Sequence, residues 1–285
     1  MNHPAELPIH QYLDNASNGK TTMSDETIEQ VAQDIKDAMK RQFGGGNRRD
    51  KFRLRMSNIG RPTCQLWWEK NHPEKALPKP TTFVMNMLIG DIVEAAFKGI
   101  LKEAGVKYED KDNAVSLELD NTTVNGSYDL VVDGALDDVK SASHWSYTNK
   151  FESYDTLAKG DGFGYIGQLA GYIKASAKKI GGWWVVNKAN GQIKYVPASG
   201  LDLDAEIAKL NRTAKIVEAN EFKRCFEPAP EVYRGKASGN KVLPEGCKFC
   251  DYRYSCWDTI KDLPSKVYQG KKTPPTVSYI GEVVG

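Results

Sequence analysis

The sequence predicts a mixed α/β fold, in which a small sheet is flanked by helices and followed by a C-terminal segment bound by cysteines. Apolar residues recur at helical spacing in several segments, and runs of β-forming residues lie between them around Asp-Gly and Asn-Gly pairs. Closely spaced cysteines stand near the end of the chain. Of the 285 residues 40% are hydrophobic and 27% are charged, which suits a buried core and excludes a disordered or fibrous chain.

The first predicted region, residues 1–50, is an appendage that holds a helix and a basic run. We expect the helix over residues 24–43, because apolar residues recur there at helical spacing and Ser24 can cap it. The basic run that follows comprises Arg48, Arg49, Lys51, Arg53 and Arg55. A solvated linker is the favoured interpretation of such a run, and a contact for a phosphate backbone is the alternative.

The segments after the basic run alternate between helical and strand patterns. A helix packed into the core is expected over residues 81–104, where Leu88, Ile92 and Ala96 recur every four residues. An Asp133-Gly134 pair predicts a tight hairpin turn between two of the following strands. The other predicted elements are strands at 115–119, 124–132 and 135–141, a helix at 165–177, a hairpin of 183–186 with 192–196, and a helix at 203–222. From residue 226 onward the sequence shows no periodicity and reads as loop.

The chain contains no tract of 18 apolar residues, so the sequence predicts no membrane span and no membrane partner. Residues 1–20 are polar and contain prolines, unlike a secretory signal. We therefore expect a cytoplasmic protein, or one of the host cytoplasm for a phage-encoded chain. Five cysteines, an odd number, argue against a disulfide framework and favour a metal site or a reactive thiol.

The hairpin around the Asp-Gly turn carries the residues with the clearest chemistry. A tight turn brings Asp129 and Asp138 together, and two adjacent carboxylates repel each other unless a cation such as Mg²⁺ or Mn²⁺ lies between them. We expect the Val139 side chain to enter the core while its carbonyl serves as a further ligand. Lys140, on the same face as Asp138, is expected to orient a water or neutralise charge on a phosphate. The alternative is a polar hairpin whose carboxylates face solvent.

Two neighbouring helices add polar groups to this hairpin. Glu94 follows Gly90 on an otherwise apolar helix, where a carboxylate needs a partner such as a metal. Gln168 and Tyr172 are four residues apart and share one helix face. This pair suits contact with a backbone phosphate or a base, and a capped core helix is the alternative.

This order of motifs resembles the RecB-like branch of the PD-(D/E)XK nucleases. The family pattern of Gly with a following acid, Gly-x-x-Asp, Asp-x-Lys and Gln-x-x-x-Tyr matches Glu94, Asp129, Asp138 with Lys140, and Gln168 with Tyr172. Several relatives have a histidine at the position of Glu94. The resemblance implies a restriction-endonuclease-like core, divalent metal bound by the three acids, a Lys140 that assists the nucleophilic water, and DNA contacts from Gln168 and Tyr172.

The cysteines form a second motif, Cys247-x2-Cys250-x5-Cys256, which lacks one ligand for a four-thiolate site. Cys64 is the best candidate for the fourth ligand, and Cys225 is the spare. Spacing alone leaves zinc and a 4Fe–4S cluster open. One early cysteine followed by this C-terminal motif resembles the iron–sulfur subset of the same branch, which includes CRISPR-associated adaptation nucleases and AddB-type nuclease domains, and this resemblance implies a 4Fe–4S cluster.

Aromatic and basic residues near the motifs suggest how a nucleic-acid strand could be bound. Most aromatic residues in proteins belong to the core, but those between Lys140 and Gln168 are the best candidates to stack on unpaired bases. Basic residues that could line a strand groove are Lys150, Arg61 and Arg55. These features favour single-stranded DNA or free ends as the partner.

The sequence and the resemblance together predict a divalent-metal-dependent DNA exonuclease of recombination, replication or repair, with proteins of those processes as further partners. The predicted regions are the appendage, a nuclease domain with its cysteine site over residues 51–262, and a tail over residues 263–285. The alternatives are a structure-specific or CRISPR-type endonuclease and a non-catalytic, cysteine-stapled DNA-binding module.

Overall fold

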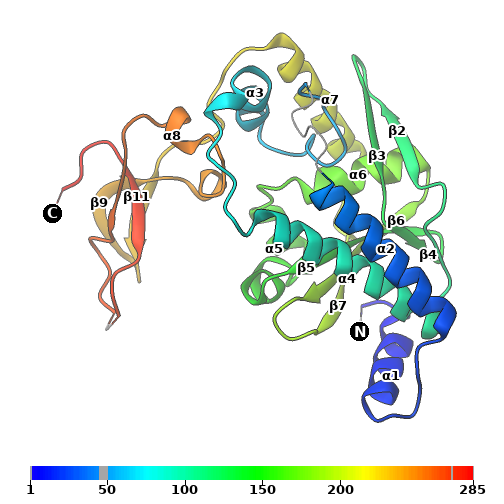
Figure 1. The fold of residues 1–285 in the computed structure, drawn as a ribbon. Coiled ribbons are helices and arrows are strands. Elements are labelled where there is room, and N and C mark those ends of the chain that lie inside the picture. Colours follow the sequence, from blue (N-terminus) through cyan, green and yellow to red (C-terminus); the bar gives the residue numbers. More distant parts are fainter. Residues whose placement is uncertain (1, 45–50, 271, 285) are drawn as a thin grey trace. The chain divides into compact units, whose positions relative to one another are not determined.

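The computed structural model describes residues 2–44, 51–270 and 272–284. Within these ranges the chain forms two compact units, one of Met1–Gly60 with Lys79–Ala214 and one of Arg61–Pro78 with Lys215–Gly285. Both units contain helices and β-strands, so the predicted mixed α/β class is confirmed (Figure 1). None of the helices in the described ranges has the length and apolar character required to cross a bilayer.

The first unit is built on a five-stranded sheet in the order β1-β4-β5-β6-β7. The β5 and β6 strands are parallel, and the other neighbours are antiparallel. The strands of this sheet are β1 (Tyr108–Glu109), β4 (Leu130–Val132), β5 (Ala135–Ala142), β6 (Lys179–Asn187) and β7 (Ile193–Pro197). A separate antiparallel hairpin is formed by β2 (Ala114–Glu118) and β3 (Thr123–Ser127).

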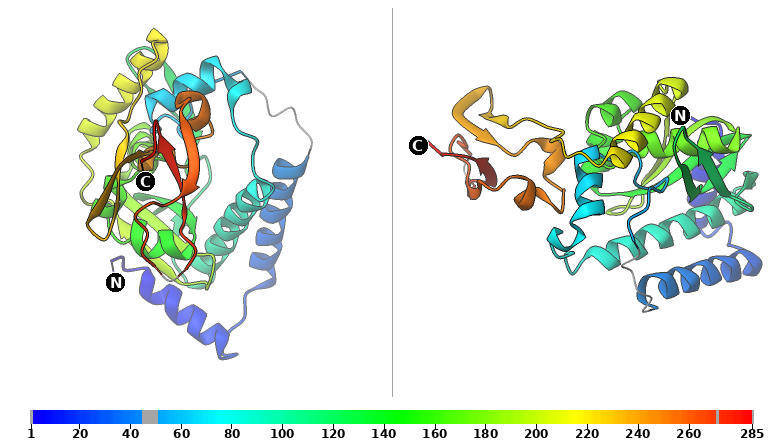
Figure 2. Two further views of the ribbon diagram at one scale, coloured as in Figure 1. Left: turned by 90° about the vertical axis from the view of Figure 1, so that its left-hand side faces the viewer. Right: turned by 90° about the horizontal axis from the view of Figure 1, so that it is seen from above.

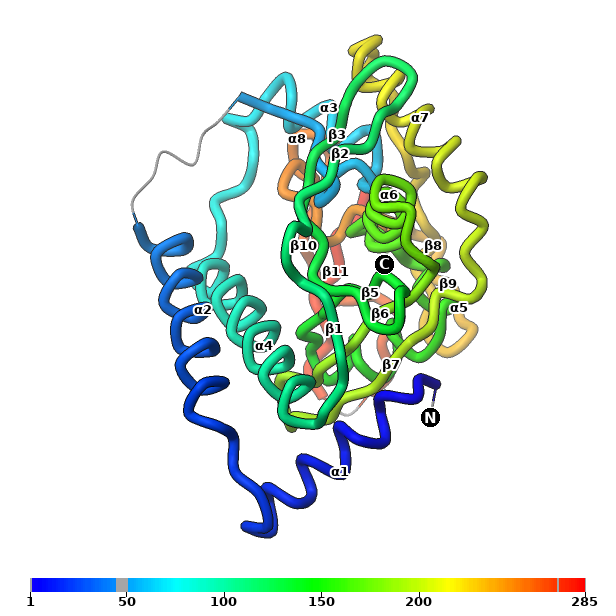
Figure 3. The backbone as a smooth tube through the Cα atoms, turned by 90° about the vertical axis from the view of Figure 1, so that its right-hand side faces the viewer, coloured from blue at the N-terminus to red at the C-terminus, as the bar shows by residue number. Residues whose placement is uncertain are grey.

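Helices accompany the sheet on both faces. Neighbouring residues of β6 enter different cores, since Trp184 packs with Phe97 of α4 whereas Trp183 packs with Leu169 of α6. Figures 2 and 3 show α2 running beside α4, and Figure 3 shows α6 beside the β2–β3 hairpin. The helices of this unit are α1 (Glu6–Ser17), α2 (Asp25–Phe43), α4 (Phe83–Glu103), α5 (Tyr154–Lys159), α6 (Tyr165–Ser176) and α7 (Leu203–Ala219), which continues into the second unit, and a π-helical turn spans Ser146–Lys150.

The predicted helices are confirmed, with ends that shift by a few residues. Ser24 caps α2 as expected, because its side chain accepts a hydrogen bond from the Thr27 N–H. The predicted Asp-Gly turn is also confirmed, and Asp133 and Gly134 have φ angles of 52° and 79°, which a hairpin turn of this type requires. The prediction of one continuous β-strand over 124–132 is wrong. Strand structure is interrupted at Tyr128, and the two parts join different sheets as β3 and β4.

The second unit shows that the loop predicted beyond residue 226 is wrong. Its core is a four-stranded antiparallel sheet in the order β10-β11-β9-β8. The strands are β8 (Ala229–Tyr233), β9 (Lys236–Val242), β10 (Ile260–Pro264) and β11 (Thr276–Ile280). The 3-10 turn Glu245–Cys247 and the helix α8 (Arg253–Cys256) lie between β9 and β10, and the unit also contains α3 (Thr63–Asn71) and the 3-10 turn Pro73–Lys75. Tyr279 of β11 is fully buried and donates to Glu231 of β8 at 2.7 Å, so a polar contact lies inside this sheet.

Candidate functional site

The hairpin of β4 and β5 brings the two predicted acids together. Leu130 pairs with Asp137 across the strands, so Asp129, one residue earlier, lies opposite Asp138. The carboxylate of Asp129 accepts a hydrogen bond from the Val139 N–H at 2.7 Å, and the Val139 side chain is buried in the core as expected. The expectation that the turn places both carboxylates at one end of the hairpin is therefore confirmed.

Lys140 lies on the same face of β5 as Asp138, and their side chains form an ion pair of 2.6 Å. Asp138 is only 3% exposed, and apart from this ion pair its Oδ2 atom has no hydrogen bond with any described residue. Burial opposes the charge of the lysine, but the neighbouring Asp138 and Asp129 outweigh it and raise the pKa of Lys140. Lys140 is therefore a fixed positive charge beside two acids.

Glu94 approaches the same acids from α4. Its carboxylate pairs with Lys98 one turn later, at 2.7 Å. Burial and the charge of Asp129 raise the pKa of Glu94, so the two carboxylates are close enough to repel each other electrostatically. The helix passes close to β5 at Gly90, where an added Cβ would lie 3.9 Å from the Ser141 hydroxyl.

The three acids are held where their ionised forms are costly. Burial, followed by the charge of Asp138, raises the pKa of Asp129 to about 6. Burial also raises the pKa of Asp138. The positive groups that neutralise these acids are Lys98 and Lys140. A bound divalent cation would favour the ionised carboxylates in the same way.

Gln168 and Tyr172 stand on α6 as predicted, but they differ in access. Gln168 is half-buried, whereas Tyr172 is 4% exposed. Burial raises the pKa of Tyr172 to about 12, so its hydroxyl stays protonated. Its ring packs against Gly126, where an added Cβ would lie 2.8 Å from it, which explains the glycine of the Gly-x-x-Asp motif. Tyr172 therefore packs inside the unit, one helical turn after the more accessible Gln168.

Sequence reasoning missed Asp137 and Lys98. Asp137 is fully buried and accepts hydrogen bonds from the Gly182 N–H (2.8 Å), the Trp184 indole (3.0 Å) and the Tyr195 hydroxyl (2.8 Å), which ties β5 to β6 and β7. Nothing in the Asp-Asp-x-Lys string marks the first acid as structural. Lys98 could have been found, because its spacing of four from Glu94 on one helix is the signal for an ion pair.

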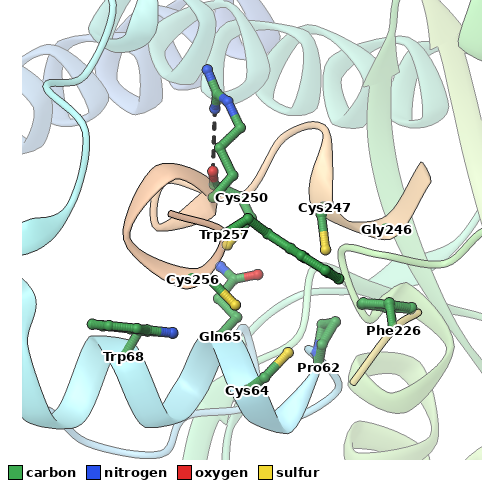
Figure 4. A pocket seen from close by; sticks show the side chains of 11 residues that line it. Pro62, Cys64, Gln65, Trp68, Phe226, Gly246, Cys247, Cys250, Cys256 and Trp257 are labelled. Carbon is green, nitrogen blue, oxygen red and sulfur yellow. Dashed lines mark hydrogen bonds between the residues drawn. The ribbon is translucent and has the colours of Figure 1, made fainter. Parts of the chain in front are cut away.

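The second unit gathers the predicted cysteine ligands. Cys64 on α3 lines one cavity with Cys247, Cys250 and Cys256, and Trp68, Phe226 and Trp257 complete its mostly apolar wall. Figure 4 shows the sulfurs of Cys64, Cys247 and Cys256 turned toward the space between α3 and the C-terminal loop. All five cysteines have free thiols. The walls contribute thiols and no carboxylate, a donor set that suits soft metals.

Cys225, the predicted spare, does not line this cavity but contacts Cys64 from outside it. Its sulfur accepts a hydrogen bond from the Cys64 N–H at 3.0 Å and lies 3.4 Å from the Thr63 hydroxyl, at the first turn of α3. Hydrogen bonding with the Cys64 thiol and with these groups lowers the pKa of Cys225. The same contact and burial raise the pKa of Cys64.

In the described part of the chain, no group of three or more His, Cys, Asp or Glu side chains is arranged to hold a single metal ion. At the acidic site the carboxylates are turned toward lysines and a backbone N–H.

The expected basic residues are dispersed. Arg61 belongs to the second unit and pairs with Glu69 at 3.0 Å. Arg55 is exposed on the segment that bridges to Asn125 of β3, so it lies along the strand that leads to the acids. Arg48 and Arg49 lie outside the described residues.

Comparison with known proteins leaves the chain without a family. No protein-family model matches it, and no curated protein does. A solved structure described as the crystal structure of SSO0001 is similar to it with 12% identity and a TM-score of 0.43, over 79% of this chain and 94% of that chain. These values are too low for the likeness to bear on fold or function.

Proposed function

We propose that this chain is a divalent-metal-dependent deoxyribonuclease of the RecB-like PD-(D/E)XK type, built on a restriction-endonuclease-like core and acting as an exonuclease on DNA ends. The convergence of Glu94, Asp129 and Asp138 beside Lys140 carries the proposal. An ion pair could explain one buried acid. Here Asp138 shares a strand face with Lys140, Asp129 lies opposite Asp138, and Glu94 comes from α4, and structural needs do not require such a charged centre.

The residues of the centre have distinct tasks. Glu94, Asp129, Asp138 and the Val139 carbonyl would hold Mg²⁺ or Mn²⁺, whose oxygen preference they match. When bound, the ion supplies a water of lowered pKa and charge stabilisation at the phosphate. Lys140 holds a permanent positive charge toward the reacting phosphate and positions the attacking water by a hydrogen bond.

Gln168 and Tyr172 act as a unit in this proposal. Gln168 presents its amide to a backbone phosphate, and the buried Tyr172, one turn later on α6, supports the helix face from which that amide projects. Tyr172 is therefore a positioning residue, because its burial leaves the strand contact to Gln168.

The thiol-lined cavity of the second unit is proposed to hold a 4Fe–4S cluster on Cys64, Cys247, Cys250 and Cys256, with structural Zn²⁺ as the alternative. Either group would be held by these four thiolates, which are the ligands that both iron–sulfur clusters and structural zinc take. The cluster would connect the Cys64 segment to the C-terminal segment and so close this unit.

The proposal is tested with end-labelled linear and circular single-stranded DNA in Mg²⁺ or Mn²⁺. Wild type is expected to degrade the linear strand only, and Lys140→Met is expected to lower the cleavage rate by at least about a hundredfold, since one positioned charge contributes on the order of 10² to 10³. Cleavage of the circle would identify the endonuclease alternative. Undiminished cleavage by a folded Lys140→Met protein would refute the site, and DNA binding with no cleavage of any DNA would identify the non-catalytic module.

A further inference from the structure

Three aromatic rings stack beside the acidic centre, at the start of α6. The rings of Phe163 and Tyr165 are 5.6 Å apart and inclined by only 17°, and the ring of Phe151 stacks on Tyr165 at 5.8 Å and 29°. We call Phe151, Tyr165 and Phe163 the aromatic stack. All three belong to the first unit, as do the acids.

Two lysines lie against the aromatic stack, and one of them, Lys140, belongs to the acidic centre. The Lys140 ammonium lies 5.0 Å from the centre of the Tyr165 ring. The Lys150 ammonium lies 4.8 Å from the same ring and 4.7 Å from that of Phe163. Tyr165 therefore lies between the proposed catalytic lysine and the second cation, and Phe163 shares that second cation.

The stack becomes more exposed from Phe151 toward Phe163. Phe151 is 3% exposed, Tyr165 is half-buried, and Phe163 is 48% exposed. A half-exposed phenylalanine beside a lysine offers an apolar face together with a positive charge. Both features fit one partner, a nucleotide whose base stacks on the ring while its phosphate meets the lysine.

The backbone fixes this arrangement. The Asp161 carboxylate accepts hydrogen bonds from the N–H groups of Tyr165 (2.9 Å) and Ile166 (2.8 Å), which caps α6. Gly164, between the two aromatic residues, has a φ of 77° and packs against the backbone of Gly60, where an added Cβ would meet atoms at 2.4 Å. The turn that carries the rings is thus held by hydrogen bonds and close packing, so little conformational entropy of this turn is lost when a ligand binds.

We propose that the exposed face of Phe163, with Lys150, is a subsite for an unpaired base next to the scissile phosphate, so that this chain selects single-stranded DNA. A base in a duplex is paired and stacked on its neighbours, and cannot lie on Phe163 without leaving the helix. The inference rests on the proposed nuclease function for the direction of the strand, since Lys140 marks where the reacting phosphate lies.

Binding without cleavage tests the subsite directly. The probe is a fluorescent single-stranded oligothymidine, compared with a blunt duplex of equal length, both titrated with full-length protein in EDTA. Because one base–aromatic stack contributes about 1–3 kcal/mol, Phe163→Ala is expected to weaken single-strand binding by about 5- to 150-fold and to leave duplex binding unchanged. Phe163→Trp is expected to restore single-strand affinity.

Phe43→Ala is the matched control, because Phe43 is 57% exposed on α2 and is remote in sequence from the stack. Its single-strand affinity is expected to equal that of wild type. A second readout is 2-aminopurine in the strand, whose fluorescence is quenched on stacking. Quenching is expected with wild type and Phe163→Trp, and is expected to be lost with Phe163→Ala. Melting temperatures confirm that each variant is folded, and Phe163→Leu keeps the apolar volume if the alanine variant does not fold.

The outcomes separate this inference from the nuclease proposal. If Phe163→Ala and Phe163→Leu bind single strands as wild type does, or lose duplex and single-strand affinity equally, the subsite is refuted even where cleavage is observed. If wild type cleaves nothing but single-strand affinity still depends on the ring at position 163, the subsite stands and the nuclease proposal fails.

Discussion

At the residue scale, the most consequential feature is the raised pKa of Asp129. Its carboxyl favours the protonated form in the folded protein because of burial and the charge of Asp138, so its pKa is about 6, against an ordinary value of 3.8. The stability contributed by this group is fully present below pH 3.8 and is lost as the pH rises through about 6. A cation bound to the ionised carboxylate would reverse that loss.

We therefore predict that Mn²⁺ raises the melting temperature more at pH 7.5 than at pH 5, because protons compete with the ion below about pH 6. Asp129→Asn is expected to abolish the Mn²⁺ effect at both pH values. Differential scanning fluorimetry, with EDTA as the reference, measures this dependence. An equal Mn²⁺ shift in wild type at both pH values would contradict the assigned ligand.

A second prediction at this scale concerns Gly126. An added Cβ would lie 2.7 Å from Met56 and 2.8 Å from Tyr172, so Gly126→Ala overfills a packed site and is expected to cost about 1–3 kcal/mol of unfolding free energy. Gly162→Ala is the control, because no atom lies within 4 Å of its added Cβ. Urea denaturation followed by tryptophan fluorescence compares the two. Equal stability of both variants would show that the Tyr172 ring moves to make room for the added methyl group.

At the element scale, the predictability of the chain depends on how long each pattern runs. The α4 helix repeats its apolar residues over five turns, and the hairpin turn of β4 and β5 has an Asp-Gly pair that few other structures accommodate, so both are read correctly from sequence. The site follows from them, since Asp138 and Lys140 share a face whenever β5 is a strand. Lys98 is also within reach of a local pattern, since it stands four residues after Glu94 on one helix. The position of Tyr165 beside Lys140 depends on tertiary packing, which no local pattern encodes.

The strands of the second unit illustrate the opposite case. Polar residues dominate β9 (Lys236–Val242), and its Gly239 has a φ of 84°, so no hydrophobic alternation announces it. The β11 strand (Thr276–Ile280) is short and follows prolines. These strands form because they pair with one another around Tyr279, a long-range effect.

That pairing leads to a prediction for Glu231 of β8. Burial would raise its pKa, but hydroxyl and amide donors, among them Tyr279, Ser265 and the Lys266 N–H, hold the pKa at about 2. Because the folded pKa is depressed, the stability it contributes is present above pH 4.5 and is lost as the pH falls through about 2.

Glu231→Gln should therefore weaken the four-stranded sheet by about 2 kcal/mol at pH 7, since hydrogen bonds to a charged group contribute about 1.5–3 kcal/mol. The difference from wild type is expected to shrink as the pH is lowered toward 2. Hydrogen exchange of the β8 and β11 amides, measured at both pH values, reports this unit separately from the first. A difference that is independent of pH would assign the effect to packing alone.

At the scale of the whole molecule, the two units contain different sets of candidate functional residues. The first contains every residue of the acidic centre and the aromatic stack, whereas the second contains all five cysteines. A cofactor bound by these cysteines is therefore expected to stabilise the second unit.

The corresponding prediction compares two cysteines. Cys250→Ser is expected to lose the brown colour and visible absorbance of anaerobically purified protein and to make the second unit sensitive to trypsin, because a ligand is removed. Cys225→Ser is expected to keep the colour, since Cys225 does not line the cavity. Iron and zinc analysis accompanies the spectra. A colourless wild type with one zinc would identify the zinc alternative, and equal loss of metal from both variants would revise the ligand set.

The alternation of β5 has one further consequence, which concerns chain length. Asp138 and Lys140 occupy one face of this strand, while Asp137 and Val139 are anchored on the other by hydrogen bonds and by the core. Removing or inserting one residue within β5 would exchange the two faces, so that Asp138 and Lys140 would point into the apolar cluster of Trp184 and Phe97, and Asp137 would lose its partners there. Homologues of this chain should therefore keep the number of residues in β5, and their insertions should fall in the β2–β3 hairpin loop.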